Sequence, residues 1–274
     1  MRKVHLITID PQNDFCIPLG PGGEKGNLVV AGADADMSRL GKFISKNKAR
    51  LEQIHCTLDS HQLVHIAHPD FWVNSKGNKP NPFTLITEDD VKNGVWRAFN
   101  PKWQGRAQAY VEALKKNGRY VLCIWPPHCL IGSWGHAIVP EVAKAIYEWE
   151  AGFNRTNFVA KGSNLFTEHY SAVAADVPDA DDISTKLNTG LIDMLGGDPD
   201  NAPPDEILIT GEALSHCVAN SIRDIASQFG TDYVQKFTLL EDTSSNVGGF
   251  EKLGQDFVKE MVKKGMKTTR TTDW

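Results

Sequence analysis

The chain has 274 residues, 41% hydrophobic and 23% charged, which is the composition of an ordinary globular protein with enough residues to bury a core. Its net charge of −5 and the lack of a dense Lys/Arg cluster argue against nucleic acid or an anionic membrane as the main partner. The N-terminal stretch MRKVHLITID is too short in apolar length for a signal peptide, and no run approaches a transmembrane span. The five cysteines show no CxxC spacing, so we expect a protein of the reducing cytoplasm.

Short apolar runs alternate with longer amphipathic segments along the chain. The apolar runs predict strands at 5–9, 51–58, 120–125, 157–160, 206–211 and 237–241. The amphipathic segments predict helices at 34–47, 104–118, 140–152, 182–197, 217–230 and 250–265, many of them ending in Gly. This alternation predicts an α/β fold with a mostly parallel sheet and helices on both of its faces.

Residues 70–104 do not fit this alternation. They contain the polar stretch NSKGNKPNPF, and we expect them to form a long excursion near the carboxyl edge of the sheet. Residues 199–205, PDNAPPD, predict a surface linker. Neither segment requires a second domain, so we expect one domain over residues 1–274.

Chemically useful side chains follow the predicted strands. In an open parallel sheet, ligands bind at the carboxyl ends of the strands, so residues placed there are expected to meet. The residues that follow the first five predicted strands, in chain order, are Asp10; Asp59, His61, His65 and His68; His128; Lys161; and Cys217.

Three of these residues suggest a cysteine nucleophile. A thiol becomes an effective nucleophile when a cation and a helix N-terminus favour the thiolate. Cys217 opens a predicted helix, Lys161 supplies a positive charge, and Asp10 can accept a proton. Each has a simpler explanation in isolation: a buried inert cysteine, a solvated lysine before a Gly turn, and a turn-forming Asp before Pro11. Together they favour catalysis.

Asp59, His61 and His128 suggest a metal site. Asp59 and His61 are two residues apart in an extended segment and point to the same side, and His128 follows the next predicted strand. Mixed N/O ligation with open positions suits a catalytic Zn, Fe or Mn ion. His65 and His68 are further ligands, supporting residues or surface residues. The simpler explanation is that these histidines cap turns and bind nothing.

Five sequence blocks in the same order resemble nicotinamidases of the isochorismatase-like cysteine hydrolase superfamily. They are IDPQNDFC with the following PGG and LVVAGAD, then DSH, WPPHCLIGSWG, AKGSNLFTEHYSA and GEALSHCVANS, and they extend from residue 5 to about residue 225. The resemblance implies a three-layer α/β/α fold of the isochorismatase-like (Rossmann-like) type, with a six-stranded sheet.

The resemblance also implies roles for individual residues. Asp10, Lys161 and Cys217 match the catalytic triad, and the backbone N–H groups of Ala213 and Cys217 match the oxyanion hole, with a cis peptide at Glu212–Ala213. Asp59, His61 and His128 match the ligands of a divalent metal ion, with Zn expected first, then Fe or Mn. The remaining pocket positions are Phe15 and Trp125, which would stack on a ring, and Tyr170 and His216 near them.

The function implied is hydrolysis of nicotinamide to nicotinate and ammonia through a thioester, a reaction suited to NAD salvage. Several positions depart from the usual pattern: Ser60 replaces an aromatic residue, Glu212 replaces an apolar residue, and LSH stands where TD and an aromatic residue are common. Pyrazinamide or a substituted pyridine carboxamide therefore stays open as substrate. A metal-independent hydrolase of a vinyl ether or ureido compound stays open too, as does a catalytically silent relative that binds a ligand. The sequence also leaves a homo-oligomer open.

Overall fold

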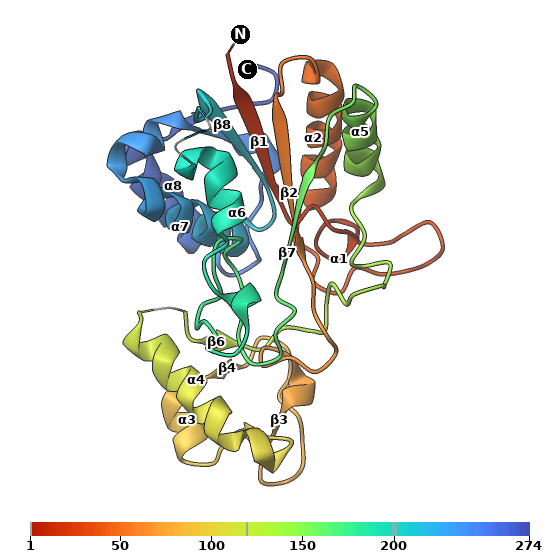
Figure 1. Ribbon diagram of the computed structural model, residues 1–274. Coiled ribbons are helices and arrows are strands. Elements are labelled where there is room, and N and C mark those ends of the chain that lie inside the picture. The colour runs from red at the N-terminus through yellow and green to blue at the C-terminus, as the bar shows by residue number, and fades with distance from the viewer. Residues whose placement is uncertain (1, 119, 199, 201) are drawn as a thin grey trace.

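A six-stranded parallel sheet forms the centre of the computed structural model (Figure 1), which describes residues 2–118, 120–198, 200 and 202–274. The strand order is β10–β9–β8–β1–β2–β7, and every neighbouring pair is parallel. The bounds are Val4–Ile9 for β1, Gln53–Asp59 for β2, Asn157–Lys161 for β7, Glu206–Gly211 for β8, Phe237–Leu240 for β9 and Lys267–Thr269 for β10. β1 and β8 are buried along their whole length, as expected of central parallel strands covered on both faces.

Helices cover both faces of the sheet (Figure 1). α2 (Ala33–Asn47) and α5 (Pro140–Glu150) pack against each other on one face. α6 (Thr189–Ile192), α7 (Ala219–Phe229) and α8 (Glu251–Lys263) lie on the other face. Right-handed crossovers explain this division, because the chain moves from β1 to β2 in one direction across the sheet and from β8 to β9 in the opposite direction. The predicted three-layer α/β/α fold is confirmed.

The strand order reverses between β1 and β8. The chain runs outward from β1 through β2 to β7, and then returns to the other side of β1 as β8. In open α/β sheets, ligands bind outside the carboxyl ends of the strands at such a switch point. Asp10 follows β1 directly, and Ala213 follows shortly after β8. The topology therefore places both residues at the expected ligand crevice.

An outer lobe, residues 69–123, extends beyond the carboxyl ends of these strands (Figure 1). It holds two small antiparallel sheets, in which β3 pairs with β5 and β4 pairs with β6. Its elements are β3 (Trp72–Val73), β4 (Leu85–Ile86), α3 (Glu88–Lys92), β5 (Arg97–Ala98), α4 (Gln104–Lys116) and β6 (Leu122–Cys123). The predicted excursion, residues 70–104, lies inside this lobe, which also includes α4 and β6.

The strand predicted at 120–125 is wrong as a member of the main sheet. Only Leu122–Cys123 forms a strand there, and it pairs with β4 in the outer lobe. The sixth strand of the main sheet is instead β10, at residues 267–269, which the sequence analysis did not predict. The sequence pattern of a short apolar run is the same in the outer lobe as in a central strand, so it does not tell the two apart. The residues of β10 are polar and largely exposed, so no apolar pattern marks them as a strand.

The helices at 34–47, 104–118, 140–152 and 250–265 are confirmed within a few residues. The single helix predicted at 182–197 is wrong: the chain forms a 3₁₀ turn, the short α6 and a π-helical turn that ends near Gly196 at φ 106°. Further short helices are α1 (Asn13–Cys16) and 3₁₀ turns at Pro69–Phe71, Pro101–Trp103, Thr231–Lys236 and Glu241–Thr243. Within the described ranges, no helix combines the length and the apolarity needed to cross a bilayer.

Two buried histidines link β1 and β2. Nδ1 of His5 lies 3.1 Å from Nε2 of His55, whose Nδ1 lies 3.1 Å from the side-chain nitrogen of Asn157 on β7. Burial, with the charge of Lys3, lowers the pKa of His5 to about 4, and burial, with His5, lowers the pKa of His55 to about 3. Both rings are therefore neutral at neutral pH.

We predict that this histidine pair contributes to acid sensitivity of the fold. In the unfolded chain these two histidines bind protons near pH 6.5, whereas in the folded protein they bind protons only near pH 4 and pH 3. The free energy of unfolding therefore falls as the pH drops below 6.5. Each such group contributes up to ~1.4 kcal/mol per pH unit. Denaturant titrations from pH 7 to pH 4.5 should show a shallower decline for His55→Gln than for the wild type. Equal slopes would contradict the prediction.

Candidate functional site

The three residues predicted to be catalytic meet at the carboxyl edge of the sheet. Lys161 is the last residue of β7, and its Nζ lies 2.9 Å from Oδ2 of Asp10 and 3.6 Å from Sγ of Cys217. Cys217 lies in a π-helical turn, Leu214–Val218, that leads from β8 into α7. Exposed fractions of 0% for Asp10, 3% for Lys161 and 7% for Cys217 show that the cluster is almost closed to bulk water.

The Asp10 carboxylate is fixed by its own backbone and by Thr57. Asp10 has a left-handed backbone with φ 45°, which a residue other than glycine keeps only when its surroundings hold it. The Thr57 hydroxyl accepts from the Asp10 N–H at 3.0 Å and donates to Oδ1 at 2.5 Å. This leaves Oδ2 directed at Lys161. The sequence analysis did not identify Thr57, since one threonine within an apolar strand carries no signal of its own.

Burial decides the protonation states of the cluster. It raises the pKa of the Cys217 thiol well above its usual value, and the opposing charge of Lys161 does not compensate. Burial also raises the pKa of Asp10 against the attraction of Lys161. Burial opposes the charge of Lys161 as well, but the carboxylates of Asp10 and Asp59 raise its pKa well above the usual range. Burial thus favours a neutral thiol at Cys217, beside a charged lysine whose Nζ lies 3.6 Å from Sγ.

Three buried histidines gather next to this cluster. One nitrogen from each of His61, His68 and His128 lies within 4.8 Å of the other two, an arrangement that can hold a metal ion. Oδ2 of Asp59 lies 3.0 Å from Nε2 of His61 and 3.3 Å from Nε2 of His128. The structure therefore brings together the predicted Asp59, His61 and His128, and adds His68 to them.

The second ring nitrogen of each of these histidines is held by a backbone carbonyl. The pairs are His61 Nδ1 with Gly162 (2.9 Å), His68 Nδ1 with Leu63 (3.1 Å) and His128 Nδ1 with Pro126 (2.9 Å). Because a carbonyl only accepts, each Nδ1 carries a proton, which leaves Nε2 as the nitrogen available to a metal ion. Metal-binding histidines in proteins are usually oriented in this way.

The donor set fits a divalent cation. Nε2 of His68 is buried and has no hydrogen-bond partner among the described residues. Nε2 of His61 and Nε2 of His128 both face Oδ2 of Asp59, so a bound cation could take the place of a proton between these atoms. Three imidazoles and one carboxylate are ligand types suited to Zn, Fe or Mn.

His65 is not available as a ligand. Its Nε2 lies 3.0 Å from the carbonyl oxygen of Thr167, and its Nδ1 accepts from the Ala67 N–H at 3.2 Å. Both nitrogens are committed to the backbone, so His65 supports the loop that carries His61 and His68. The sequence spacing alone did not separate His65 from His68.

A narrow cavity of about 30 Å³ borders both groups of residues. It is lined by the predicted pocket residues Phe15, Trp125, Tyr170 and His216, by Asp59, His128, Ala213 and Cys217, and by Leu28, Glu168 and Val247, which the sequence analysis missed. Ala213 follows a cis peptide at Glu212–Ala213, as expected. The cavity thus connects the thiol and the turn at Ala213 to the histidine–carboxylate cluster.

Aromatic rings shape this cavity. Phe15 stands edge-on to His128 with ring centroids 5.3 Å apart, and Trp125 stands edge-on to His216 at 5.4 Å. The indole N–H of Trp125 donates to the Tyr170 hydroxyl at 2.9 Å, which fixes both rings. Flat aromatic walls with few polar groups suit a small planar ligand.

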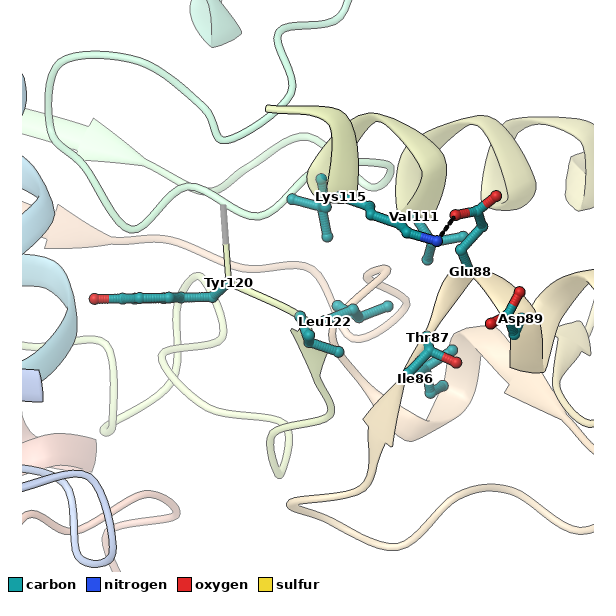
Figure 2. A pocket seen from close by; sticks show the side chains of 10 residues that line it. Ile86, Thr87, Glu88, Asp89, Val111, Lys115, Tyr120 and Leu122 are labelled. Atoms are coloured by element: carbon teal, nitrogen blue, oxygen red, sulfur yellow. Dashed lines mark ion pairs between the residues drawn. The ribbon is translucent and has the colours of Figure 1, made fainter. Parts of the chain in front are cut away.

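A larger cavity of about 380 Å³ lies in the outer lobe (Figure 2). α3, α4 and β6 enclose it, and an ion pair between Lys115 and Glu88 at 2.7 Å borders it. Among the described residues that line it, none belongs to the predicted catalytic or metal-binding set. Tyr120 connects the two regions, since it lines the larger cavity and its ring centroid lies 5.6 Å from that of His216. The chemistry is therefore assigned to the smaller cavity.

Comparison with known proteins supports the resemblance found in the sequence. No family model matches the chain. The nicotinamidase of Saccharomyces cerevisiae is 23% identical over 218 residues, which span 78% of this chain and 76% of that protein.

Solved structures agree with this. The Acinetobacter baumanii nicotinamidase/pyrazinamidase superimposes with a TM-score of 0.62 at 21% identity, covering 100% of this chain and 98% of that one. The yeast nicotinamidase structure gives a TM-score of 0.64 at 19% identity, covering 97% and 99%. A Pyrococcus horikoshii pyrazinamidase in complex with zinc gives 0.55 at 18% identity, covering 98% and 99%. The predicted isochorismatase-like fold and the resemblance to its nicotinamidase branch are confirmed.

We predict that His68, and not His65, contributes to metal binding. His68→Ala should weaken zinc binding at least ~10-fold, because Nε2 is removed from the cluster. The measurement is competition of the purified protein with a chromogenic chelator. His65→Gln is the matched control, and it should keep the wild-type zinc affinity even if it unfolds at lower temperature. Equal loss of affinity in both variants, or in neither, would contradict this assignment.

We also predict that Cys217 is alkylated slowly at neutral pH. Because burial raises the pKa of its thiol, the rate of reaction with iodoacetamide should rise with a midpoint above the ordinary value of ~8.5. Mass spectrometry of the peptide that contains Cys217 follows the reaction, with Cys217→Ser as background. A midpoint near pH 7 would show a resting thiolate instead.

Proposed function

We propose that this protein is a metal-dependent cysteine amidase that hydrolyses nicotinamide to nicotinate and ammonia. The observation that carries the proposal is the shared cavity, which borders a thiol with a carboxylate and a lysine on one side and a histidine–carboxylate cluster on the other. A pyridine carboxamide needs both: a nucleophile for its amide carbon and a site for its ring nitrogen. The nicotinate produced would serve NAD salvage.

Acylation uses Cys217 and Asp10, which both lie next to Nζ of Lys161. Asp10 accepts the thiol proton as Sγ attacks the amide carbon, and the raised pKa of Asp10 makes it a stronger base than an exposed aspartate. The backbone N–H groups of Ala213 and Cys217 stabilise the oxyanion. Asp10 then gives its proton to the amide nitrogen, the C–N bond breaks, and ammonia leaves a thioester on Cys217.

Hydrolysis of the thioester uses the same groups. Asp10 accepts a proton from water as the water oxygen attacks the acyl carbon. The C–S bond breaks, nicotinate is released, and the proton returns to Sγ of Cys217. Lys161, 2.9 Å from Asp10 and 3.6 Å from Cys217, stabilises the negative charge in each step and orients the carboxylate.

The metal site orients the substrate. Asp59, His61 and His128, with His68, would hold a divalent ion, which supplies a Lewis acid that binds the ring nitrogen. Phe15 and Trp125 lie at the walls of the cavity and would contact the ring, with Tyr170 and His216 beside Trp125. The histidine cluster disfavours a metal-independent hydrolase of the isochorismatase type. Pyrazinamide presents the same amide and a ring nitrogen, so we expect it as a second substrate.

The proposal is tested by ammonia release from nicotinamide. The wild type loaded with zinc should release ammonia, and Cys217→Ala should lower kcat at least ~10³-fold, because the attacking atom is lost. Prior chelation should also abolish turnover, and added zinc should restore it. Cys56→Ala is a matched control, because this buried cysteine on β2 has no role in the mechanism.

Each contrary result has a definite meaning. Ammonia release that survives chelation would contradict the metal assignment and leave the cysteine chemistry in place. Turnover by Cys217→Ala close to the wild-type level would contradict the nucleophile. A zinc-loaded wild type that releases no ammonia from nicotinamide would contradict the substrate, and pyrazinamide and substituted pyridine carboxamides would then be tested.

A further inference from the structure

The side chain of Glu212 is a buried acid directly before Ala213. Its exposed fraction is 0%, so the carboxyl group lies entirely within the protein. Its backbone N–H donates to the carbonyl of Ile9 at 2.8 Å, which ties this point of the chain to the end of β1. The proposed mechanism does not use this side chain. A buried carboxyl group is costly unless it is hydrogen-bonded, so its contacts call for an explanation.

Ser244 and Ser245 form hydrogen bonds with the residues before and after Ala213, and these bonds are called the clamp below. The Ser245 N–H donates to Oε2 of Glu212 at 3.0 Å, and the Ser245 carbonyl accepts from the Leu214 N–H at 2.8 Å. The Ser244 hydroxyl donates to the carbonyl of Gly211 at 2.6 Å. The residues before and after Ala213 are therefore both fixed to one short segment after β9, and Glu212 takes part in this clamp through its side chain.

Glu212 also faces a second buried acid, Asp36 of α2. Both carboxyl groups contact Ser245, whose N–H donates to Glu212 and whose hydroxyl donates to Asp36, and two buried carboxylates so close to one residue are not readily both ionised. Asp36 has its own partners, since Arg39 lies 2.5 Å from Oδ1 and the Ser245 hydroxyl donates to Oδ2 at 2.5 Å. Oε1 of Glu212 has no donor among the described residues. Because Asp36 has the larger number of donors, the proton is assigned to Glu212.

The surrounding charges agree with this assignment. Burial, followed by the charge of Asp36, raises the pKa of Glu212 well above its usual value, and the charge of Arg39 only partly opposes this. Cys16 of α1 is also nearby, and burial raises the pKa of its thiol well above the usual value. Asp10 and Asp34 contribute further negative charge around the same thiol. The groups around Glu212 thus favour its uncharged form.

We propose that Glu212 is a positioning residue for the reaction, a neutral acid that accepts from Ser245 and donates to Asp36 and thereby fixes the N–H of Ala213. The inference rests on the proposed amide hydrolysis, in which Ala213 is an oxyanion donor. A donor must sit close to the place where the oxyanion forms, and small displacements lower the rate strongly. Fixing this turn to α2 and to the segment after β9 gives the N–H a single position.

Glu212→Gln and Glu212→Met test the proposal. Gln keeps an oxygen that accepts from Ser245 and an amide that donates to Asp36, whereas Met has a similar length and offers neither. Glu212→Met should lower kcat for nicotinamide at least ~10-fold with KM changed less than ~3-fold, since binding of the ground-state amide does not depend on the oxyanion donor. Glu212→Gln should recover most of the lost kcat.

A second measurement requires no substrate. Amide hydrogen exchange of the peptide that covers residues 211–218 should be faster in Glu212→Met than in the wild type, because the clamp at Ser245 loses one of its bonds. Glu212→Gln should exchange like the wild type. If the wild type does not hydrolyse nicotinamide, the proposed function fails, while this exchange still decides whether Glu212 holds the turn.

Three outcomes would overturn the proposal. The first is a wild-type kcat in Glu212→Met. The second is an equal loss in both variants, which would show that a neutral donor does not replace the acid. The third is a loss confined to KM, which would place Glu212 in substrate binding. If Glu212→Met does not fold, Glu212→Gln alone tests the proposal. A kcat of Glu212→Gln more than ~10-fold below that of the wild type would then reject the positioning role of Glu212.

Discussion

The buried ammonium group of Lys161 is the interaction on which the rest of the site depends. Its Nζ lies 2.9 Å from Asp10, 3.2 Å from Asp59 and 3.6 Å from Cys217. Two carboxylates and a thiol in one nearly closed space would repel or remain protonated without a cation, and an unpaired buried charge costs about 3–5 kcal/mol. Asp59 also faces the histidine cluster. One lysine at the end of β7 therefore contacts both the Cys217 side and the histidine side of the cavity, and it compensates the carboxylate charge on both.

The strand ends show why much of the site could be predicted from sequence. Asp10, Asp59 and Lys161 each stand at the carboxyl end of a strand. Parallel strands bring these ends to one edge of the sheet, and this does not depend on the conformation of the connecting loops. His68 is different, because its place depends on how residues 62–68 fold, and a sequence of closely spaced histidines does not specify which ring nitrogens the backbone engages. The strand predicted at 120–125 failed for a related reason: an apolar pattern records burial, and burial occurs in the outer lobe as well as in the main sheet.

The resting thiol shows where local rules of sequence are insufficient. A helix start and a neighbouring lysine favour a thiolate, but the effect of Lys161 on the pKa of Cys217 is smaller than that of burial. A neutral thiol next to an aspartate of raised pKa is also a coherent arrangement for catalysis. In the proposed mechanism Asp10 receives the thiol proton as sulfur attacks, so no negative charge on sulfur is required in the resting site. Under that proposal Cys217 stays unreactive until an amide fills the pocket.

Glu212 does not line the cavity, but its contacts bear on the same site. At position 212 this chain has a buried acid that accepts from Ser245, next to Asp36, which Ser245 and Arg39 hold by hydrogen bonds. A buried polar network whose hydrogen bonds are only partly satisfied stabilises the fold less than an apolar contact would. Its advantage must therefore come from the part of the chain that it holds in place. It fixes the turn between β8 and α7, and the same turn carries Ala213 and leads to Cys217. Sheet topology brings Cys217 to the crevice, and we propose that a polar network on α2 and the segment after β9 fixes the neighbouring N–H of Ala213.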